Sequence, residues 1–190
     1  YMIAGRGTPD QAPARLFAFS HRQEMAALLA ILAERSADYL IRQIEAGADA
    51  VQIFDSWAGV LDEDLFELCC IEPVRRMVER VRAVFPETPI IGFPRGAGGL
   101  YDSYRAKTGV TALGLDWSMP FAQARRLQAD GAVQDNLDPL RLQAGGAALE
   151  DGVAAILRAL ADGPFVFNLG HGVTPQTPVA HVEKMVALVR

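Results

Sequence analysis

Short apolar runs alternate with longer amphipathic stretches along this chain. The runs are rich in Val, Ile, Leu and Phe and are bounded by Gly, Pro or Asp; they lie at residues 51–54, 89–93, 112–115, 132–134 and 165–169. Short, uniformly apolar runs with such boundaries are typical of buried strands in a parallel sheet. The pattern therefore predicts a series of parallel strands.

The stretches between the runs have the spacing of amphipathic helices. In residues 22–46, apolar side chains recur every three or four positions, and Ser20 with Gln23 predicts a capping box at the start. Gly47 is expected just past the end of this helix. Proline at a first helical position predicts two further helix starts, at Pro73 and at Pro178. Other helices are expected at 99–107, 120–129 and 147–161.

Strands that alternate with helices predict an α/β fold of consecutive β/α units. A closed eight-stranded barrel typically needs about 250 residues, and this chain has 190. The pattern leaves two architectures open, an open doubly wound sheet and part of a (β/α)8 TIM-type barrel. Because no linker, repeat or low-complexity segment interrupts the pattern, we expect a single domain over residues 1–190.

Composition narrows the class of protein. Hydrophobic residues make up 51% of the chain, and the net charge of −5 comes without a basic block, so nucleic acid is not an expected partner. The longest apolar run, residues 25–33, is far shorter than the roughly 20 residues of a membrane helix. The adjacent Cys69 and Cys70 do not suggest a disulfide framework, which favours the cytoplasm. Since the chain begins Tyr1-Met2, we expect the start of the natural protein to be missing.

Polar residues follow every predicted strand. In order along the chain they are Asp55, Ser56 and Trp57; Arg95 and the glycine-rich residues 96–99; Asp116 and Trp117; Asp135, Asn136 and Asp138; and Asn168, Gly170 and His171. In β/α proteins the carboxyl ends of parallel strands meet at one edge, where functional groups gather. We therefore predict one site at that edge.

Several of these residues also have a simpler interpretation. Asp138 before Pro139 is a good helix N-cap. Asp116 fits loop orientation as well as chemistry, and Trp117 fits packing better than ligand stacking. Residues 96–99 match no phosphate-binding fingerprint, which favours a plain loop over an anion site.

His171 is the residue for which a functional role is favoured. It lies between Gly170 and Gly172, where the backbone can approach a ligand closely, and imidazole carries protons near neutral pH. His21 and His181 lie at predicted helix starts and are interpreted as surface residues.

Three reaction types are disfavoured by the residues present. A Schiff-base enzyme needs a lysine at a strand end, but Lys107 and Lys184 lie in helical segments. Zinc sites need grouped histidine and cysteine ligands, and Cys69-Cys70 has no histidine at ligand spacing. Without a G-x-S-x-G elbow, Ser56 is interpreted as a hydrogen-bond donor rather than a nucleophile.

Six segments resemble, in the same order, segments of the uroporphyrinogen decarboxylase family. They are YMI with AGRG (1–7), GADAVQIFDSWAG (47–59), IIGFPRGAGGLY (90–101), GLDWSMP (114–120), QDNLDP (134–139) and FNLGHGVTPQTP (167–178). The family fold is a distorted (β/α)8 barrel, often a homodimer. The resemblance thus implies part of a TIM-type barrel, with this chain as its C-terminal part and the N-terminal part absent.

The resemblance also implies an activity and a set of site residues. The family removes carboxyl groups from the four acetate side chains of uroporphyrinogen III to give coproporphyrinogen III in tetrapyrrole and heme biosynthesis, with no metal or organic cofactor. By correspondence Tyr1, Ser56 and His171 bind the substrate, His171 is also the catalytic candidate, and Phe54 lines the cleft.

Two family features are not in this chain. The aspartate that binds the pyrrole NH groups and the QAGRY-type segment that supplies substrate-binding arginines both lie upstream in the family, and Ala4 and Arg6 stand where the family has glutamate and glycine. We therefore expect the chain alone to lack activity. The alternatives left open are a corrinoid-related methyltransferase of similar barrel fold, which would need zinc ligands, and a non-catalytic barrel fragment that acts by association.

Overall fold

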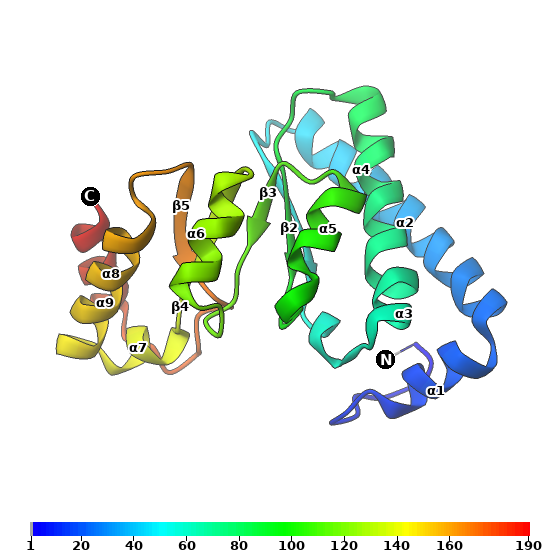
Figure 1. Cartoon of the computed structure of the whole chain (residues 1–190), viewed down its shortest axis with the longest axis horizontal. Coiled ribbons are helices and arrows are strands. Elements are labelled where there is room, and N and C mark those ends of the chain that lie inside the picture. The colour runs from blue at the N-terminus through cyan, green and yellow to red at the C-terminus, as the bar shows by residue number, and fades with distance from the viewer. Residues whose placement is uncertain (1) are drawn as a thin grey trace. The chain divides into compact units, whose positions relative to one another are not determined.

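Strands and helices alternate along the whole of this protein, whose computed structural model describes residues 2–190 (Figure 1). The chain divides into two compact units, Tyr1–Val110 and Thr111–Arg190. Each unit contains parallel strands joined by helical connections. This confirms the predicted α/β class with parallel strands that alternate with helices.

The first unit has two strands and a helical layer. Its elements are α1 (Ala12–Ser20), α2 (Arg22–Glu45), β1 (Val51–Asp55), a 3₁₀ turn (Ala58–Val60), α3 (Glu63–Phe66), a π-helical turn (Glu67–Ile71), α4 (Glu72–Val84), β2 (Ile90–Pro94), a second 3₁₀ turn (Gly98–Leu100) and α5 (Tyr101–Thr108). Strands β1 and β2 are parallel, with Val51 opposite Ile90 and Asp55 opposite Pro94. The ends of both strands therefore lie at one edge.

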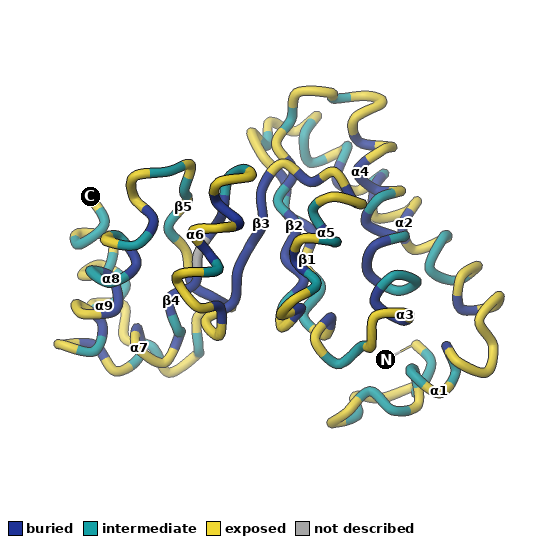
Figure 2. The backbone as a smooth tube through the Cα atoms, viewed as in Figure 1, coloured by how far each residue is buried: buried dark blue, intermediate teal, exposed yellow. Residues whose placement is uncertain are grey.

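The core of the first unit includes one side of α4, which packs against α2, and residues of β1. Val74, Met77, Val78 and Val81 are buried on one side of α4 (Figure 2). Val51 and Ile53 of β1 are buried as well, whereas Phe54 between Ile53 and Asp55 is exposed. Alternate residues of a strand point to opposite faces, so Asp55 shares the helix-facing side of β1 with Val51 and Ile53.

The predicted capping box at the start of α2 is wrong. Ser20 is the last residue of α1, a helix that the pattern did not predict, and the junction residue is His21. The ring of His21 stacks on Phe17 at 4.9 Å between centroids, and its backbone N–H donates to the Phe17 carbonyl. Ser20 is thus already helical and cannot cap the next helix. Gly47 has a φ of 106° just beyond α2, as predicted for a helix end.

The prediction for Pro73 needs a similar correction. Helical structure begins earlier, at Glu63, and Pro73 is the second residue of α4 rather than its first. A proline within a helix lacks an N–H and collides with the carbonyl four residues before it. The π-helical turn Glu67–Ile71 lies directly before α4, and such a turn changes the local hydrogen-bond pattern.

The second unit has three parallel strands. Its elements are β3 (Ala112–Gly114), α6 (Phe121–Ala129), β4 (Ala132–Leu137), α7 (Pro139–Ala144), α8 (Gly146–Leu160), β5 (Phe165–Leu169) and α9 (Val179–Val189). Ala112 pairs with Ala132, and Leu137 pairs with Leu169. Its apolar core comprises Leu137, Leu142, Leu149, Val153, Ile156 and Leu169.

Two helix starts in this unit test the sequence interpretation. The Asp138 side chain accepts a hydrogen bond from the Leu140 N–H at 2.8 Å, which confirms its predicted role as a helix cap. Pro178 is the N-cap of α9 rather than its first residue. The helix signal at Pro178 was therefore correct, and its position was off by one residue.

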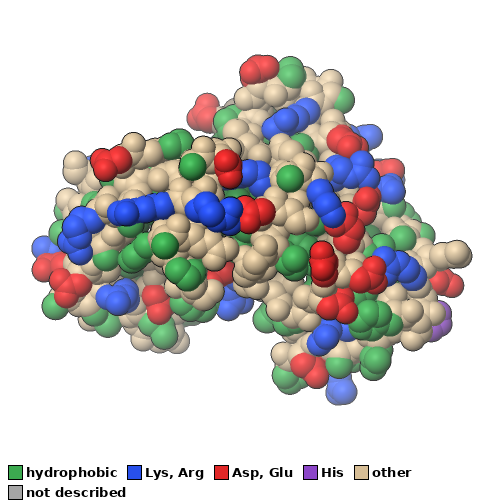
Figure 3. Space-filling view, in the orientation of Figure 1, with side chains coloured by type: hydrophobic (Ala, Val, Ile, Leu, Met, Phe, Trp, Pro, Cys, Tyr) green, Lys and Arg blue, Asp and Glu red, His purple; other side chains and the backbone are tan. Residues whose placement is uncertain are grey.

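The surface carries charges of both signs. Figure 3 shows acidic and basic side chains interspersed over the face in view. In the first unit several of them form ion pairs, among them Arg22–Asp64 and Lys107–Glu67, both at 2.6 Å. No helix in residues 2–190 is both long and apolar enough to cross a membrane.

Candidate active site

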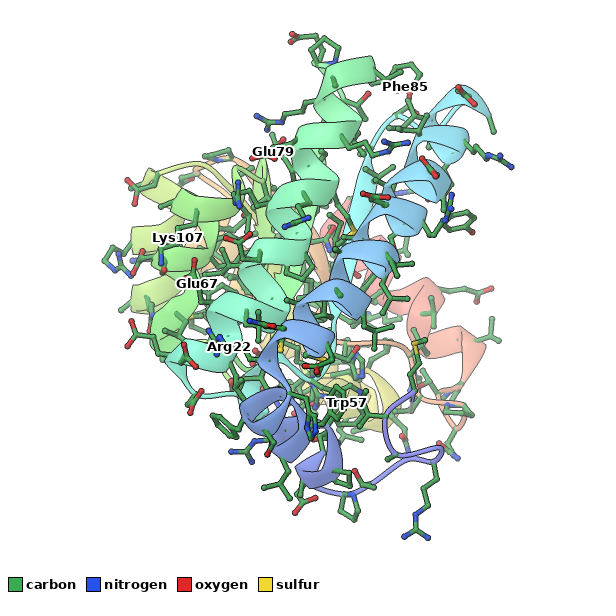
Figure 4. All side chains as sticks on the ribbon, turned by 90° about the vertical axis from the view of Figure 1, so that its right-hand side faces the viewer. Arg22, Trp57, Glu67, Glu79, Phe85 and Lys107 are labelled. Carbon is green, nitrogen blue, oxygen red and sulfur yellow. The ribbon has the colours of Figure 1, made fainter. Side chains whose placement is uncertain are left out.

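The residues that follow β1 form the first part of the candidate site. Figure 4 places Trp57 at the end of the first unit opposite Phe85, the residue that follows α4. Ser56 lies between the last residue of β1 and Trp57. Its carbonyl accepts a hydrogen bond from the Arg95 guanidinium at 3.4 Å. Among the described residues, no hydrogen bond holds the Ser56 hydroxyl, so a ligand can use it.

The Asp55 side chain connects this loop to the π-helical turn that contains Cys70. One oxygen of its carboxylate, Oδ2, lies 2.9 Å from the Cys70 Sγ, and the other, Oδ1, accepts from the Trp57 N–H at 3.3 Å. Burial raises the pKa of Asp55 above its usual range, while the hydrogen bonds from Cys70 and Trp57 lower it. Burial, followed by the nearby Asp55 charge, also raises the pKa of the Cys70 thiol. Cys70 therefore stays protonated and donates to the carboxylate.

The loop after β2 clamps the loop after β1. The Arg95 N–H donates to the Asp55 carbonyl at 3.0 Å, and the Gly59 N–H donates to the Arg95 carbonyl at 2.9 Å. A Cβ atom at Gly59 would lie 2.6 Å from the Gly96 carbonyl oxygen. Gly96 itself has a φ of 76°, which glycine tolerates best. Residues 96–99 were interpreted as a plain loop, and at Gly96 that loop has a steric role.

Phe54 lies on the opposite face of β1 from Asp55. Its side chain is 65% exposed, although its ring meets the ring of Phe93 edge-on at 6.0 Å between centroids. The exposed face of this ring is available to an apolar ligand. This is compatible with the predicted role of Phe54 in lining a cleft, a role that stays a prediction.

In the second unit, His171 follows β5 and faces Trp117. The two ring centroids are 6.3 Å apart, with 32° between the ring planes. His171 is exposed, and Trp117 is 39% exposed. Trp117 also borders a cavity of about 580 Å3 that is lined by Asn136, Asp138 and Arg141, among others. An accessible imidazole and a half-exposed indole thus lie side by side at the carboxyl ends of β3 and β5.

Close backbone packing fixes the position of His171. A Cβ atom at Gly170 would lie 2.4 Å from the Trp117 backbone nitrogen, and the Gly170 N–H donates to the Leu137 carbonyl at 2.8 Å. Under this contact, Asp116 is 4% exposed and accepts hydrogen bonds from the backbone N–H and the hydroxyl of Ser118. Of its two interpretations, loop orientation is the one that these bonds support.

The predicted site residues fall in different parts of the chain. Ser56 and Phe54 belong to the first unit and His171 to the second, and Tyr1 lies outside the described residues. That these side chains border one cleft stays a prediction. His181 was interpreted as a surface residue, which is wrong: it is half-buried, and its Nδ1 lies 3.0 Å from the Leu142 carbonyl.

Sequence reasoning gave too little weight to four supporting residues. Asp55 and Gly170 were counted only as polar rim residues, and Cys70 and Gly59 were given no role in the site. One available signal was the FDSWAG order itself, in which a carboxylate directly precedes the serine and a glycine follows three residues later. The contact partners of Gly59 and Cys70, which are Gly96 and Asp55, lie far away in sequence and could not be predicted from it.

Cys69 and Cys70 are free thiols. Within residues 2–190, no group of three or more His, Cys, Asp or Glu side chains is placed to hold a metal ion. Burial also raises the pKa of Cys69 to about 11.

Comparison with known proteins identifies the family. The family model "Uroporphyrinogen decarboxylase (URO-D)" matches residues 1–190. The chain is 66% identical over 190 residues to the uroporphyrinogen decarboxylase of Mesorhizobium japonicum, covering 100% of this chain and 55% of that protein. It is 64% identical to the uroporphyrinogen decarboxylases of Chelativorans sp. and Brucella anthropi, again over the whole chain and over 56% of each relative.

The chain thus spans about half the length of the curated relatives that it matches. The family fold is a TIM-type barrel, and the parallel β/α units described above are part of such a barrel, not of an open doubly wound sheet. By sequence, by fold class and by the match over all its residues, this chain belongs to the uroporphyrinogen decarboxylase family.

Proposed function

We propose that this chain is the C-terminal part of a uroporphyrinogen decarboxylase, a carboxy-lyase of heme biosynthesis. In the whole protein it would help convert uroporphyrinogen III to coproporphyrinogen III without a metal or organic cofactor. The observation that carries the proposal is His171, which is exposed beside Trp117 at the end of β5 within the NLGHG segment. Family membership supplies the reaction class.

The proposed roles follow from the chemistry of the substrate. Uroporphyrinogen carries carboxylates on every pyrrole ring, and carboxylates are bound best by directed N–H and O–H donors. The Ser56 hydroxyl and the His171 imidazole would donate to such carboxylates, as would Tyr1. Phe54, which is 65% exposed on β1, would provide an apolar surface for the macrocycle.

The reaction needs a proton donor and a negatively charged group near the pyrrole ring. Protonation makes a pyrrole ring electron-poor, so the ring accepts the electron pair of the breaking carbon–carboxylate bond as carbon dioxide leaves. A proton is then added to the resulting methylene carbon to give the methyl group, and the ring releases the proton it had gained. Negative charge held near the cationic ring stabilises this intermediate. His171 is the proton-carrying side chain that we assign to this step in the present chain.

Three further statements belong to the same proposal. The chain alone would be inactive, because the family aspartate that binds the pyrrole NH groups is not among its matching segments. The whole protein would act as a homodimer, and it would work in the cytoplasm. Gel filtration of the whole protein tests the second of these.

A full-length chimera tests the proposed activity. Residues 1–190 would replace the matching part of the Mesorhizobium japonicum protein, and coproporphyrinogen would be measured by porphyrin fluorescence after oxidation. We expect activity in the parent chimera and at least a roughly tenfold lower turnover in His171→Asn, since general acid–base groups typically contribute about 100-fold or more. His21→Asn, at the helix junction, is the control. A folded but inactive chimera, or full turnover in His171→Asn, would contradict the proposal.

A further inference from the structure

We propose that Asp55 is a positioning residue for Ser56: its half-buried carboxylate, held by the Cys70 thiol, fixes the backbone of the Ser56 loop so that the serine hydroxyl faces the substrate. The inference deepens the proposed function, on which its kinetic part rests. It gives a role to the residues directly under the site, Asp55 and Cys70. Neither of them would touch the substrate.

The Asp55 carboxylate lies beside buried apolar residues. It occupies the helix-facing side of β1 with Val51 and Ile53, which are 5% and 8% exposed. A carboxylate there is costly unless its oxygens are hydrogen-bonded. The pKa of Asp55 is raised mainly by burial, which is the sign of that cost. A group kept in such a place is expected to have specific partners, and both of its oxygens do.

The two hydrogen-bond partners of the Asp55 carboxylate, the Cys70 thiol and the Trp57 N–H, have different roles. Cys70 is 1% exposed in the π-helical turn Glu67–Ile71, so its thiol is a fixed point of the helical layer. It holds Oδ2 at 2.9 Å. Oδ1 is then turned toward the loop, where it accepts the Trp57 N–H. The carboxylate therefore connects the helical layer to the peptide that follows Ser56.

The backbone is constrained on both sides of Ser56, whereas no hydrogen bond within residues 2–190 holds its hydroxyl. The Asp55 and Ser56 carbonyls accept from Arg95, and the Trp57 N–H is bound by Asp55. Backbone groups before and after Ser56 are thus fixed. This arrangement is expected if the loop serves to present the hydroxyl, since preorganised donors bind without reordering.

A merely structural role for Asp55 would predict something different. Loss of a stabilising contact lowers the amount of folded protein and leaves the kinetics of the folded fraction unchanged. Loss of a positioning contact weakens substrate binding through Ser56, so the effect vanishes when Ser56 has already been replaced. The two roles are therefore separable by a double-mutant cycle.

The first experiment needs no activity and uses the 190-residue chain. Amide hydrogen exchange at Trp57 should become about tenfold faster in Asp55→Ala, which loses the acceptor, and change less than about threefold in Asp55→Asn, which keeps one. Cys70→Ala should also speed exchange at Trp57, but less than Asp55→Ala does. In Cys70→Ser the exchange rate at Trp57 should be close to that of the parent. The Ala124 amide, bonded within the other unit, reports unfolding of that unit as a reference. Unchanged exchange at Trp57 in Asp55→Ala, with Ala124 also unchanged, would overturn the proposal.

The second experiment measures kinetics in the full-length chimera. Asp55→Ala should raise KM about tenfold or more with kcat changed less than about threefold, and Asp55→Asn should restore most of the affinity. In the Ser56→Ala background, Asp55→Ala should add less than about twofold. Independent, multiplicative effects of the two substitutions would overturn the positioning role. If the parent chimera makes no product, the proposed function fails, and the exchange measurement still decides the role of Asp55.

Discussion

The loops that carry Ser56 and His171 are held in place by different means. At Ser56 the carboxylate of Asp55 connects the loop to the buried Cys70 thiol. Two residues after β2 also contact this loop: Arg95 donates to the Ser56 carbonyl, and Gly96 packs against Gly59. At His171 the adjacent Gly170 rests on the Trp117 peptide, and its N–H is bound by a backbone carbonyl. One loop depends on side-chain chemistry and the other on the absence of a side chain.

This difference teaches what each loop can tolerate. Steric contacts with backbone atoms cannot relax by a rotamer change, so the His171 loop should fail whenever volume is added at Gly170. The Ser56 loop contains one such contact, at Gly59, together with an ionisable group whose protonation depends on pH. Added volume should therefore disturb both loops, and in the Ser56 loop the protonation of Asp55 adds a dependence on pH.

The largest effect is expected for Gly170→Ala. The new Cβ would lie 2.4 Å from the Trp117 nitrogen, so the backbone of one of the two loops must shift. We expect a loss of about 3 kcal/mol of unfolding free energy, at the upper end for overpacking, measured by urea denaturation. Gly172→Ala is the matched control, because no atom lies within 4 Å of a Cβ there. Its effect should stay within about 0.5 kcal/mol. Equal effects at the two glycines would show that packing on Trp117 does not hold the loop.

Gly59→Ala should have a smaller effect on the other loop. Its Cβ would lie 2.6 Å from the Gly96 carbonyl oxygen, a slightly longer distance than the 2.4 Å at Gly170. We expect a loss of about 1–2 kcal/mol by urea denaturation. Gly99→Ala, where nothing lies within 4 Å of the Cβ, serves as the control. A Gly59→Ala protein as stable as Gly99→Ala would argue against the clamp between the two loops.

The sequence predicted the elements of this fold well and their supports less well. The five apolar runs correspond to β1 to β5, and the polar residues after them lie at strand ends. These features could be predicted because a short apolar run with turn residues at its ends is a local signal for a buried strand. Asp138 was interpreted correctly as a cap since its partner, Leu140, is two residues away. The bond between Cys70 and Asp55 spans 15 residues and the contact between Gly59 and Gly96 spans more. Such contacts depend on how the helices and strands pack, which periodicity does not record.

The smallest expected effect is the pH dependence of the Ser56 loop. The pKa of Asp55 is raised in the folded protein, mainly by burial. Below the unfolded-state pKa of about 3.9, the carboxyl is protonated in both states and costs nothing. As pH rises toward the folded-state pKa, only the unfolded chain releases the proton, so stability from this group is lost. Asp55→Asn cannot ionise, and its stability relative to the parent should therefore increase as pH rises from about 4 toward the raised folded-state pKa of Asp55.

Asp38 provides the control of opposite sign. The hydrogen bond from Arg80 lowers its pKa, so its contribution is present above the unfolded-state pKa and is lost as pH falls. Asp38→Asn should therefore lose stability relative to the parent as pH rises toward the unfolded-state pKa of about 3.9, and the difference should stay constant at higher pH. Gly170→Ala should shift the parent curve by a constant amount at every pH. Urea denaturation across this range compares the three variants. If the difference in stability between Asp55→Asn and the parent does not change with pH, folding does not shift the pKa of Asp55. Both loops would then be held mainly by steric contacts.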